Sequence, residues 1–233
     1  MLYKLKTSCQ WRMLPIKNDE VKWISVYKLF NHWSQHQVFS NIFKSSLKDL
    51  KNSKAHGQLC QVNLDGTPSL AKHGGEEVSY QFCKKGRKTN LLFCTNKAGK
   101  ILALSEGIAG NHNDLYEIER YVKPMLKLIK SVGYDLKDVL FQADKGFDSQ
   151  GFRKFLQNRG LKPNIDENER NRKSQKLGRK RFFDKESYQN RFTKERTFAW
   201  MDGFKNILIR FDKKVMNWLA WNQIAAATIN FNL

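Results

Sequence analysis

VNLDG at Val62–Gly66 is the stretch that indicates how this chain folds. Its apolar residues alternate with polar ones, which is the pattern of a half-buried β-strand, and Asp-Gly is a frequent turn pair. A second stretch, FQADKG at Phe141–Gly146, also places an aspartate directly after an apolar run, with a glycine two residues later. We therefore expect Asp65 and Asp144 each to lie at the end of a strand.

Strands and helices are expected to alternate around these two stretches. Apolar residues at strand or helix spacing, separated by turn residues, predict further elements. The expected strands are 59–64, 88–94, 101–104, 139–141 and 161–165, and the expected helices are 114–130, 149–160, one from about 184, and 215–229. NKAG at Asn96–Gly99 predicts a hairpin. This order predicts an α/β domain over 58–233, with an RNase H-like mixed sheet and flanking helices.

Residues 1–57 form a small helical region in this interpretation. NDE at Asn18–Glu20 is a helix start signal, and apolar residues recur at helical spacing through Trp33 and again over Val38–Leu47. The region could belong to a helix-turn-helix that reads DNA, or it could be a helical cap whose aromatic residues only form a core. The polar residues that could contact bases are Lys22, Lys28, Asn31 and Gln35.

The composition points to a polyanionic partner. The 233 residues include 42 Lys and Arg against 22 Asp and Glu, a formal net charge of +20. Each cation that contacts a phosphate releases a counterion, so an excess of this size favours nucleic acid. A membrane surface is less favoured, because the sequence has no apolar run near the ~18 residues of a spanning helix and no signal-peptide pattern. We expect a cytoplasmic, nucleoid-associated protein that binds double-stranded DNA.

The four cysteines do not indicate a metal site. They are Cys9, Cys60, Cys83 and Cys94, and none forms a C-x-x-C pair with another. This spacing argues against a zinc site. Because nothing indicates secretion, we expect reduced thiols that are mostly buried.

Two basic segments are the expected contacts with the DNA backbone. The first comprises Lys84, Lys85, Arg87 and Lys88. The second comprises Arg170, Arg172, Lys173, Lys176, Arg179, Lys180 and Arg181. Runs of charge are more often solvated faces, but the net charge of the chain favours DNA here. Such contacts would position the duplex without reading its sequence.

Three carboxylates, those of Asp65, Asp144 and Glu195, are candidates for metal-dependent phosphoryl transfer. That reaction activates a nucleophile and stabilises a leaving oxygen on opposite sides of one phosphorus, which two divalent cations about 3.5–4 Å apart can do. Mg²⁺ prefers oxygen ligands, and Mn²⁺ can substitute, so three carboxylates could hold two ions. The plain alternatives are an Asp-Gly turn at Asp65, a turn cap at Asp144 and a surface pair between Glu195 and Arg191.

Four further residues are expected to support the site. Tyr188, Arg191 and Glu195 are spaced by three and then four positions, so they would share one helix face. Arg191 could orient Glu195 or bind a phosphate, and Tyr188 could pack there or stack on a base. His112 is expected to hydrogen-bond or to contact DNA. Asp114 is expected to cap the next helix, with a supporting role at the site as the second interpretation.

Four segments resemble bacterial insertion-sequence transposases of the D-D-E class, in particular the insertion-sequence-five group. They are VNLDGT at Val62–Thr67, GNHND at Gly110–Asp114, ADKGFD at Ala143–Asp148, and Tyr188, Arg191 and Glu195 followed by RTFAW at Arg196–Trp200. The last is similar to the Y-(2)-R-(3)-E signature of the family. The resemblance covers nearly the whole chain.

The resemblance implies a DNA transposase that cleaves and joins strands at insertion-sequence ends with Mg²⁺ or Mn²⁺. Asp65, Asp144 and Glu195 match the catalytic positions of the family, whose members commonly act as homodimers on paired ends. The chain departs from the wider signature at Asp202, where relatives often have a lysine. Relatives also carry a longer N-terminal segment, so we expect 1–57 to be an incomplete DNA-binding region. The alternative function is an inactive DNA-binding remnant or a domesticated fragment of a transposase.

Overall fold

The structure is a computed structural model that describes residues 1–17, 21–168, 181–189 and 192–231. Its helices are α1 (Leu2–Thr7), α2 (Trp23–Gln35), α3 (Val38–Asn52), α4 (Ile118–Ser131), α5 (Gln150–Gln157), α6 (Lys185–Gln189), α7 (Phe192–Asp202), α8 (Lys205–Leu208) and α9 (Val215–Phe231). Its strands are β1 (Gln61–Ala71), β2 (Ser79–Gln81), β3 (Gly86–Asn96), β4 (Ile101–Leu104), β5 (Ile108–Ala109), β6 (Leu140–Ala143), β7 (Lys162–Ile165) and β8 (Ile209–Arg210). Short 3-10 helices are η1 (Trp11–Met13), η2 (Phe82–Lys84) and η3 (Lys145–Phe147).

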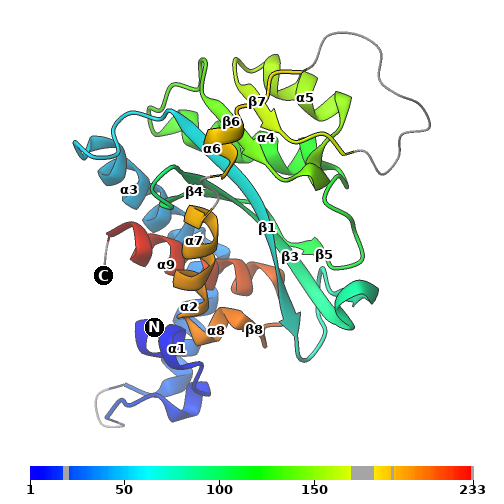
Figure 1. Ribbon diagram of the computed structural model, residues 1–233. Coiled ribbons are helices and arrows are strands. Elements are labelled where there is room, and N and C mark those ends of the chain that lie inside the picture. Colours follow the sequence, from blue (N-terminus) through cyan, green and yellow to red (C-terminus); the bar gives the residue numbers. More distant parts are fainter. Residues whose placement is uncertain (18–20, 169–180, 190–191, 232–233) are drawn as a thin grey trace.

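The strands form one mixed sheet (Figure 1). Its path runs β2-β3-β1-β6-β7, and β4 also pairs with β3. The β3–β4 and β1–β3 pairs are antiparallel, whereas the β1–β6 and β6–β7 pairs are parallel. Helices α4 and α5 provide the connections that lead into β6 and β7. The expected RNase H-like mixed sheet is confirmed, and so is the hairpin at Asn96–Gly99, where the Gly99 amide donates to the Asn96 carbonyl at 3.0 Å.

Strand β1 is longer than the sequence indicates, and this corrects the expected position of Asp65. The strand continues through Gly66 and Pro68 to Ala71, so Asp65 lies inside the strand and not at its end. The second half of β1 pairs with β3, which has the same length. Because cross-strand pairing along a long partner outweighs local preference, the Asp-Gly pair does not form a turn.

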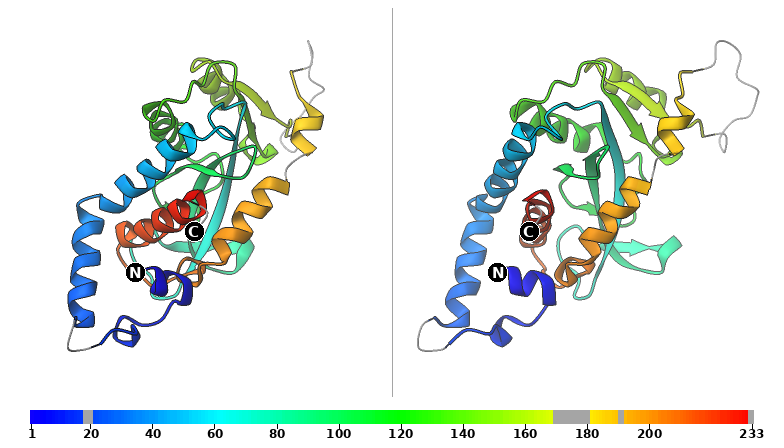
Figure 2. Two further views of the ribbon diagram at one scale, coloured as in Figure 1. Left: turned by 90° about the vertical axis from the view of Figure 1, so that its left-hand side faces the viewer. Right: turned by 60° about the vertical axis from the view of Figure 1, so that its left-hand side comes forward.

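Helices cover both faces of the sheet. Figure 2 shows α3, α4 and α9 on one side of β1 and α7 on the other. Helix α9 lies between α3 and the sheet, and its Trp218, Trp221 and Ala225 are 0 % exposed. A helix that is apolar all round is stable when other elements cover it all round, so the terminal helix packs as expected. No helix in the described ranges is both long and apolar enough to cross a membrane.

The N-terminal helices share one hydrophobic core with the sheet. Phe30 of α2 stacks on Trp221 of α9, with ring centroids 4.2 Å apart and an interplanar angle of 17°. Phe39 of α3 in turn packs on Phe30, at 5.4 Å between centroids. The two expected helices are confirmed as α2 and α3, whereas the start signal Asn18–Glu20 lies outside the described residues. A division of the chain at residue 57 stays a proposal.

Helix α4 begins later than expected, and the capping role expected of Asp114 is wrong. The helix starts at Ile118, its N-cap is Glu117 in the left-handed conformation (φ 43°), and no side chain caps it. A separate turn precedes the helix, because the Asn113 side chain accepts a hydrogen bond from the Leu115 amide at 3.1 Å. This turn places Asp114 before the helix and leaves its carboxylate available for other contacts.

The expectation of mostly buried thiols is wrong for two of the four cysteines. Cys60 and Cys83 are exposed, Cys9 is partly buried and Cys94 is buried, and none of the four forms a disulfide. Cys60 precedes β1 and Cys83 lies in η2. Both therefore occupy connections at the margin of the sheet, where one side of the chain faces solvent.

Tyr134 makes the free energy of unfolding depend on pH in the alkaline range. The residue is 4 % exposed, and its hydroxyl donates a hydrogen bond to the His56 carbonyl at 3.2 Å. Burial raises the pKa of Tyr134 from 10.0 to about 12. Because the pKa of Tyr134 is higher in the folded than in the unfolded chain, the neutral hydroxyl stabilises the fold. This stabilisation is fully present below pH 10 and is lost as the pH rises towards 12.

We expect wild type to be more stable than Tyr134→Phe at pH 8, by roughly 1–2 kcal/mol after allowance for partial solvent screening. This difference should shrink between pH 10 and 12, which urea unfolding at a series of pH values would measure. Tyr80→Phe, at a tyrosine that is 46 % exposed, is the control and should change little. A difference for Tyr134→Phe that stays constant with pH would contradict this role.

Candidate active site

The two candidate aspartates belong to neighbouring parallel strands or directly follow them: Asp65 lies in β1, and Asp144 follows β6. Gln61 of β1 pairs with Leu140 of β6, and Asn63 pairs with Gln142, so paired residues are 79 positions apart (140 minus 61). Asp144 follows Asp65 by the same 79 positions (144 minus 65). Continued by two residues beyond Asn63 and Gln142, this register would bring the two aspartates side by side on one face, since neighbouring strands are about 4.8 Å apart. This pairing follows from the register of the sheet and from no local feature of either stretch.

Each aspartate is partly buried and has neighbours that orient it. Asp65 accepts a hydrogen bond from the Gly66 amide at 2.8 Å. Asp144 directly follows the last residue of β6, as expected, and its Oδ1 lies 3.5 Å from the Tyr188 hydroxyl. Two adjacent carboxylates offer only oxygen ligands, which is the chemistry that Mg²⁺ and Mn²⁺ accept.

A row of buried amide side chains lies one layer below the aspartates. Asn63, Gln142 and Asn164 are neighbours across β1, β6 and β7, and they are 2 %, 1 % and 0 % exposed. Asn63 accepts from Gln61 Nε2 at 2.6 Å and donates to the Asn96 carbonyl at 3.3 Å. Sequence reasoning missed this row. The available signal was a polar residue two positions before each aspartate within an otherwise apolar strand.

Asn164 holds the segment that carries Tyr188. Its Nδ2 donates to the Asp184 carbonyl at 3.0 Å, and its Oδ1 accepts from the Asp184 amide at 2.9 Å. Asp184 in turn begins α6, because its carboxylate accepts from the Ser187 hydroxyl at 2.6 Å and the Ser187 amide at 3.0 Å. These bonds from Ser187 lower the pKa of Asp184. A buried residue of β7 thus positions α6, and α6 brings Tyr188 to Asp144.

We expect Asn164→Ala to lower the free energy of unfolding by about 1–3 kcal/mol, since it leaves two backbone groups of Asp184 without their partner. Asn164→Asp should be at least as destabilising as Asn164→Ala, because it buries a carboxylate and sets one of its oxygens against the Asp184 carbonyl oxygen, which cannot donate. Denaturant unfolding and hydrogen exchange of the Asp184 amide would measure both effects. Asn158→Ala, at an exposed asparagine, is the matched control. Unchanged protection of the Asp184 amide would contradict the proposed contact.

Glu195 lies on the helix that covers the aspartate face, although it is itself exposed. Phe198 of α7 makes an edge contact with Phe93, at 5.6 Å between centroids and 89° between planes, and Phe93 pairs with Asp65 across β1 and β3. The middle of α7 is held by Thr197, whose hydroxyl donates to the Gly99 carbonyl at 2.7 Å. Within the described ranges, no three acidic, imidazole or thiol side chains converge closely enough to hold a metal ion. That Glu195 completes the metal site therefore stays a prediction, as does the role of Arg191, which lies outside the described residues.

Asp114 lies near Asp144 instead of capping a helix. Its Oδ2 would be 2.5 Å from a Cβ added at Gly146, so glycine at that position gives the carboxylate its space. Burial raises the pKa of Asp114, and the negative charge of Asp144 raises it further, while Lys84 acts in the opposite direction. A supporting role for Asp114 thus agrees with its surroundings and stays a prediction.

His112 and the first basic segment lie on the same side of the site. The His112 ring stacks on Tyr116, with centroids 3.4 Å apart and planes at 9°. The Gly110 amide donates to the Lys88 carbonyl at 3.0 Å, which joins this loop to β3. Lys84, Lys85 and Arg87 are exposed, and Lys88 is partly exposed. Burial lowers the pKa of Lys88, and the neighbouring Lys84 lowers it further.

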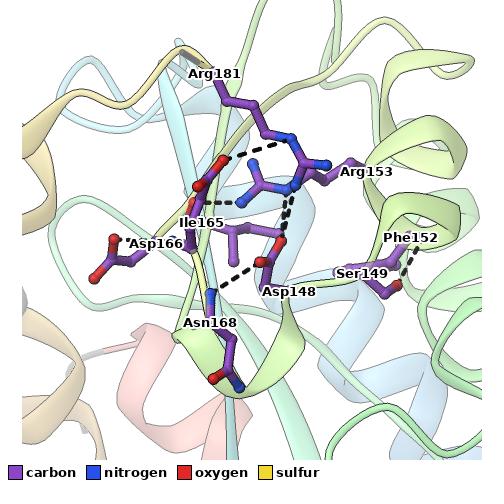
Figure 3. A network of polar contacts seen from close by, with 9 residues as sticks. Asp148, Ser149, Phe152, Arg153, Ile165, Asp166, Asn168 and Arg181 are labelled. Atoms are coloured by element: carbon purple, nitrogen blue, oxygen red, sulfur yellow. Dashed lines mark hydrogen bonds and ion pairs between the residues drawn. The ribbon is translucent and has the colours of Figure 1, made fainter. Parts of the chain in front are cut away.

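Asp148 joins residues on both sides of positions 169–180 (Figure 3). Its Oδ1 accepts from Arg153 Nε at 2.7 Å and from Arg181 Nη1 at 3.4 Å, and its Oδ2 accepts from the Asn168 amide at 3.0 Å. Arg153 also donates to the Ile165 carbonyl at 2.6 Å. The Asp148 and Arg153 side chains are only 10 % and 8 % exposed. The network therefore holds Arg181 beside the end of β7.

Of the second basic segment, Arg181 is described by the structure. The remaining expected DNA contacts lie outside the described residues: Arg170, Arg172, Lys173, Lys176, Arg179 and Lys180. Arg181 also lines a groove of ≈ 880 Å³ along α5 and β7, together with Lys154 and Lys162. Lys154, Lys162 and Arg181 thus extend the basic surface from the edge of the site along β7, the last strand of the sheet.

Comparisons with known proteins relate nearly the whole chain to one family. A family profile of transposases of the IS4/5 family matches residues 1–43, and a profile described as Transposase DDE domain matches residues 56–230. A search of curated proteins gives no match. Among solved structures, a piggyBac transposase synaptic complex with hairpin DNA is 14 % identical with a TM-score of 0.43, and the match covers 74 % of this chain and 46 % of that one. A Mos1 transposase paired-end complex with the left transposon end is 12 % identical with a TM-score of 0.33, and the match covers 98 % and 76 %. The chain thus spans about half the length of the piggyBac chain.

Proposed function

We propose that this chain, which belongs to the DDE transposases of the IS4/IS5 type, cleaves DNA at the ends of an insertion sequence and joins those ends to a target. The observation that supports the proposal is the parallel register of β1 and β6, whose continuation by two residues would bring Asp65 beside Asp144 on one face of the sheet. Carboxylates from segments that are distant in sequence are thereby gathered where a scissile phosphate could be held. A mixed sheet alone would not specify this activity.

In this proposal Asp65 and Asp144 hold divalent metal, and Glu195 completes the ligand set. When bound, two Mg²⁺ or Mn²⁺ ions would supply Lewis acidity on both sides of the phosphorus. Tyr188 keeps the Asp144 carboxylate oriented through its hydroxyl, and Asp114 adds negative charge beside it. Arg191 either orients Glu195 or binds a phosphate oxygen.

Double-stranded DNA is the proposed partner, and basic side chains around the site are its proposed contacts. Lys84 ends η2 and Lys85 follows it, Arg87 and Lys88 lie in β3, and Arg181 donates to Asp148. Each phosphate contact would strengthen binding in a salt-dependent way. We further propose that helices of 1–57 contact the transposon end, that two copies act together on paired ends, and that the protein works at the nucleoid in the cytoplasm.

The second candidate function is DNA binding without cleavage, as in a remnant or a domesticated transposase. One observation favours it: Glu195 is exposed, and no three metal-ligating side chains converge within the described part of the chain. If the protein cleaves DNA, DNA binding could bring Glu195 towards the two aspartates. If it only binds DNA, no such movement is needed.

Cleavage of a labelled insertion-sequence-end duplex would test the proposal. The full chain should bind the duplex in Ca²⁺ and nick it when Mg²⁺ or Mn²⁺ is added, and EDTA should prevent nicking. A duplex of scrambled end sequence is the control for specificity. Binding without nicking under all metal conditions would reject the catalytic function and support the DNA-binding alternative. Neither binding nor nicking would reject both functions for this chain.

A further inference from the structure

The hairpin formed by β2, η2 and the start of β3, residues 79–88, carries two exposed aromatic rings. Phe82 is 83 % exposed, more than any other large apolar side chain that the structure describes, and Tyr80 is 46 % exposed. The two rings make an edge contact, with centroids 5.2 Å apart and planes at 79°. A single exposed apolar residue needs no explanation, but two rings in contact form a small apolar surface in solvent. We call residues 79–88 the Phe82 hairpin.

All the charged side chains of the Phe82 hairpin are cations. Residues 79–88 include Lys84, Lys85, Arg87 and Lys88 and no acidic residue. Tyr80 pairs with Arg87 across β2 and β3, and residues directly opposite each other in an antiparallel pair lie on the same face. One face of the hairpin therefore offers aromatic rings and a guanidinium together.

The Phe82 hairpin projects from the sheet at the end of β3 (Figure 2), and the loop after β5 holds it in place. The Ser79 hydroxyl donates to Asn111 Oδ1 at 2.7 Å and accepts from the Asn111 amide at 2.9 Å. Glycine at position 110 allows the loop to approach β3, because a Cβ added there would lie 2.6 Å from the Lys88 carbonyl oxygen. The hairpin is thus fixed through both of its strands, so little ordering is needed when a partner binds.

The same loop connects the Phe82 hairpin to the candidate site. Asp114 follows Asn111 by three residues, and its carboxylate lies against Gly146, two residues after Asp144. Burial raises the pKa of Asp114, Asp144 raises it further and Lys84 lowers it, so this carboxylate is near a charge of the site and a charge of the hairpin. DNA held at the aspartates would therefore extend past the hairpin.

DNA fits the surface of the Phe82 hairpin better than a second copy of the chain does. In a two-fold contact the same patch faces itself, so the four cations of each copy would be brought together without any acid to pair them. DNA neutralises such cations with its phosphates, and its bases offer flat faces to aromatic rings. In a duplex those faces become free at a base step that opens, and Phe is among the side chains that DNA-binding proteins insert there.

From these observations we infer that Phe82 inserts at a base step of the DNA that this chain binds, with Tyr80 in edge contact and with Lys84, Lys85 and Arg87 on the flanking phosphates. The inference rests on the proposed function, because it concerns DNA held by the protein, but it does not require cleavage. Every base has a face on which a ring can stack, so this contact holds DNA without reading its sequence.

Anisotropy of a labelled end duplex in Ca²⁺, measured at several salt concentrations, tests the insertion without any need for cleavage. We expect Phe82→Ala and Phe82→Leu to weaken binding about tenfold at every salt concentration, because both remove the ring and neither removes a charge. Lys85→Ala should also weaken binding, and it should reduce the slope of log affinity against log salt by about 0.9. Phe231→Ala, which removes another exposed phenylalanine (38 %), is the matched control and should change neither quantity.

End duplexes with 2-aminopurine at successive positions would then locate the base step. Fluorescence should rise at one step when wild type binds, because an inserted ring unstacks the neighbouring base. Phe82→Leu should abolish this rise even at concentrations that saturate the duplex. Urea unfolding should be the same for Phe82→Leu and wild type, because the Phe82 ring is 83 % exposed.

The outcomes separate this inference from the catalytic function. If the Phe82 variants bind weakly and wild type never nicks the duplex, the inference stands and the catalytic function falls. If wild type nicks the duplex and Phe82→Leu binds it equally well, the inference falls alone. If Phe82→Leu changes only the mass of the protein in solution, the hairpin is a contact between copies and the inference is overturned. Absence of any duplex binding by wild type overturns both.

Discussion

Asp144→Asn is expected to reduce metal-dependent nicking of an end duplex by about 10³-fold or more while DNA binding is retained. The amide keeps the shape of the side chain and can still accept from the Tyr188 hydroxyl, which lies 3.5 Å from Asp144. It removes, however, the negative charge that holds a hard divalent cation. Metal stabilisation of the transition state is worth several kcal/mol, and about 4 kcal/mol corresponds to about 10³-fold in rate.

Single-turnover nicking, Mn²⁺ affinity from electron paramagnetic resonance, and fluorescence anisotropy of the duplex would measure the three quantities separately. Asp49→Asn is the matched control, because Asp49 is an exposed aspartate on α3. We expect weaker Mn²⁺ binding for Asp144→Asn and no change for Asp49→Asn. If Asp144→Asn nicks DNA within about tenfold of wild type, Asp144 does not hold a catalytic metal.

Asp148→Ala is expected to cost about 3–5 kcal/mol of folding free energy. It would leave the guanidinium of Arg153, which is 8 % exposed, without its ion-pair partner at 2.7 Å. Removal of one member of a buried ion pair is costly because the remaining charge stays desolvated. The change would also release the Asn168 amide and Arg181, so the basic surface beside β7 would lose its anchor.

Asp138→Asn is the comparison that isolates burial, because asparagine tolerates the left-handed backbone of this position (φ 61°). Asp138 pairs with Lys162 at 2.9 Å, but the two side chains are 62 % and 55 % exposed, so we expect little change. Urea unfolding of both variants, followed by anisotropy of a labelled duplex at several salt concentrations, would measure stability and DNA affinity. An Asp148→Ala variant that is no less stable than Asp138→Asn would show that the Asp148 network does not support the fold.

Local patterns predicted most of the elements, but they predicted the limits of β1 and α4 poorly. Gly66 and Pro68 are turn residues by themselves, and only the presence of β3 as a long antiparallel partner keeps them in a strand. Asp114 has the composition of a helix cap, yet the turn at Asn113 separates it from α4 and places it near Asp144. In both cases a neighbour distant in sequence outweighed a local preference.

Some residues of the candidate site could be predicted from the sequence and others could not, because only some of them carry a local signal. Asp65 and Asp144 could be proposed from short motifs, because an aspartate after an apolar run is visible locally. Asn164 carries no such mark, and its role depends on a contact with Asp184, 20 residues later. The hollow between α1, α2 and the segment from α8 to α9 could not be predicted at all, since its walls come from both ends of the chain.

The sequence by itself determined the family, the mixed α/β class, the basic character and the identity of the candidate carboxylates. These properties depend on residue types and on short spacings between them, and both can be read directly from the sequence. Only the tertiary structure decided that β1 and β6 pair in parallel, that Asn164 positions α6, and that Asp148 holds Arg181. Those relations depend on which strands pair and in what register, and strand pairing joins residues whose separation along the chain carries no local signal.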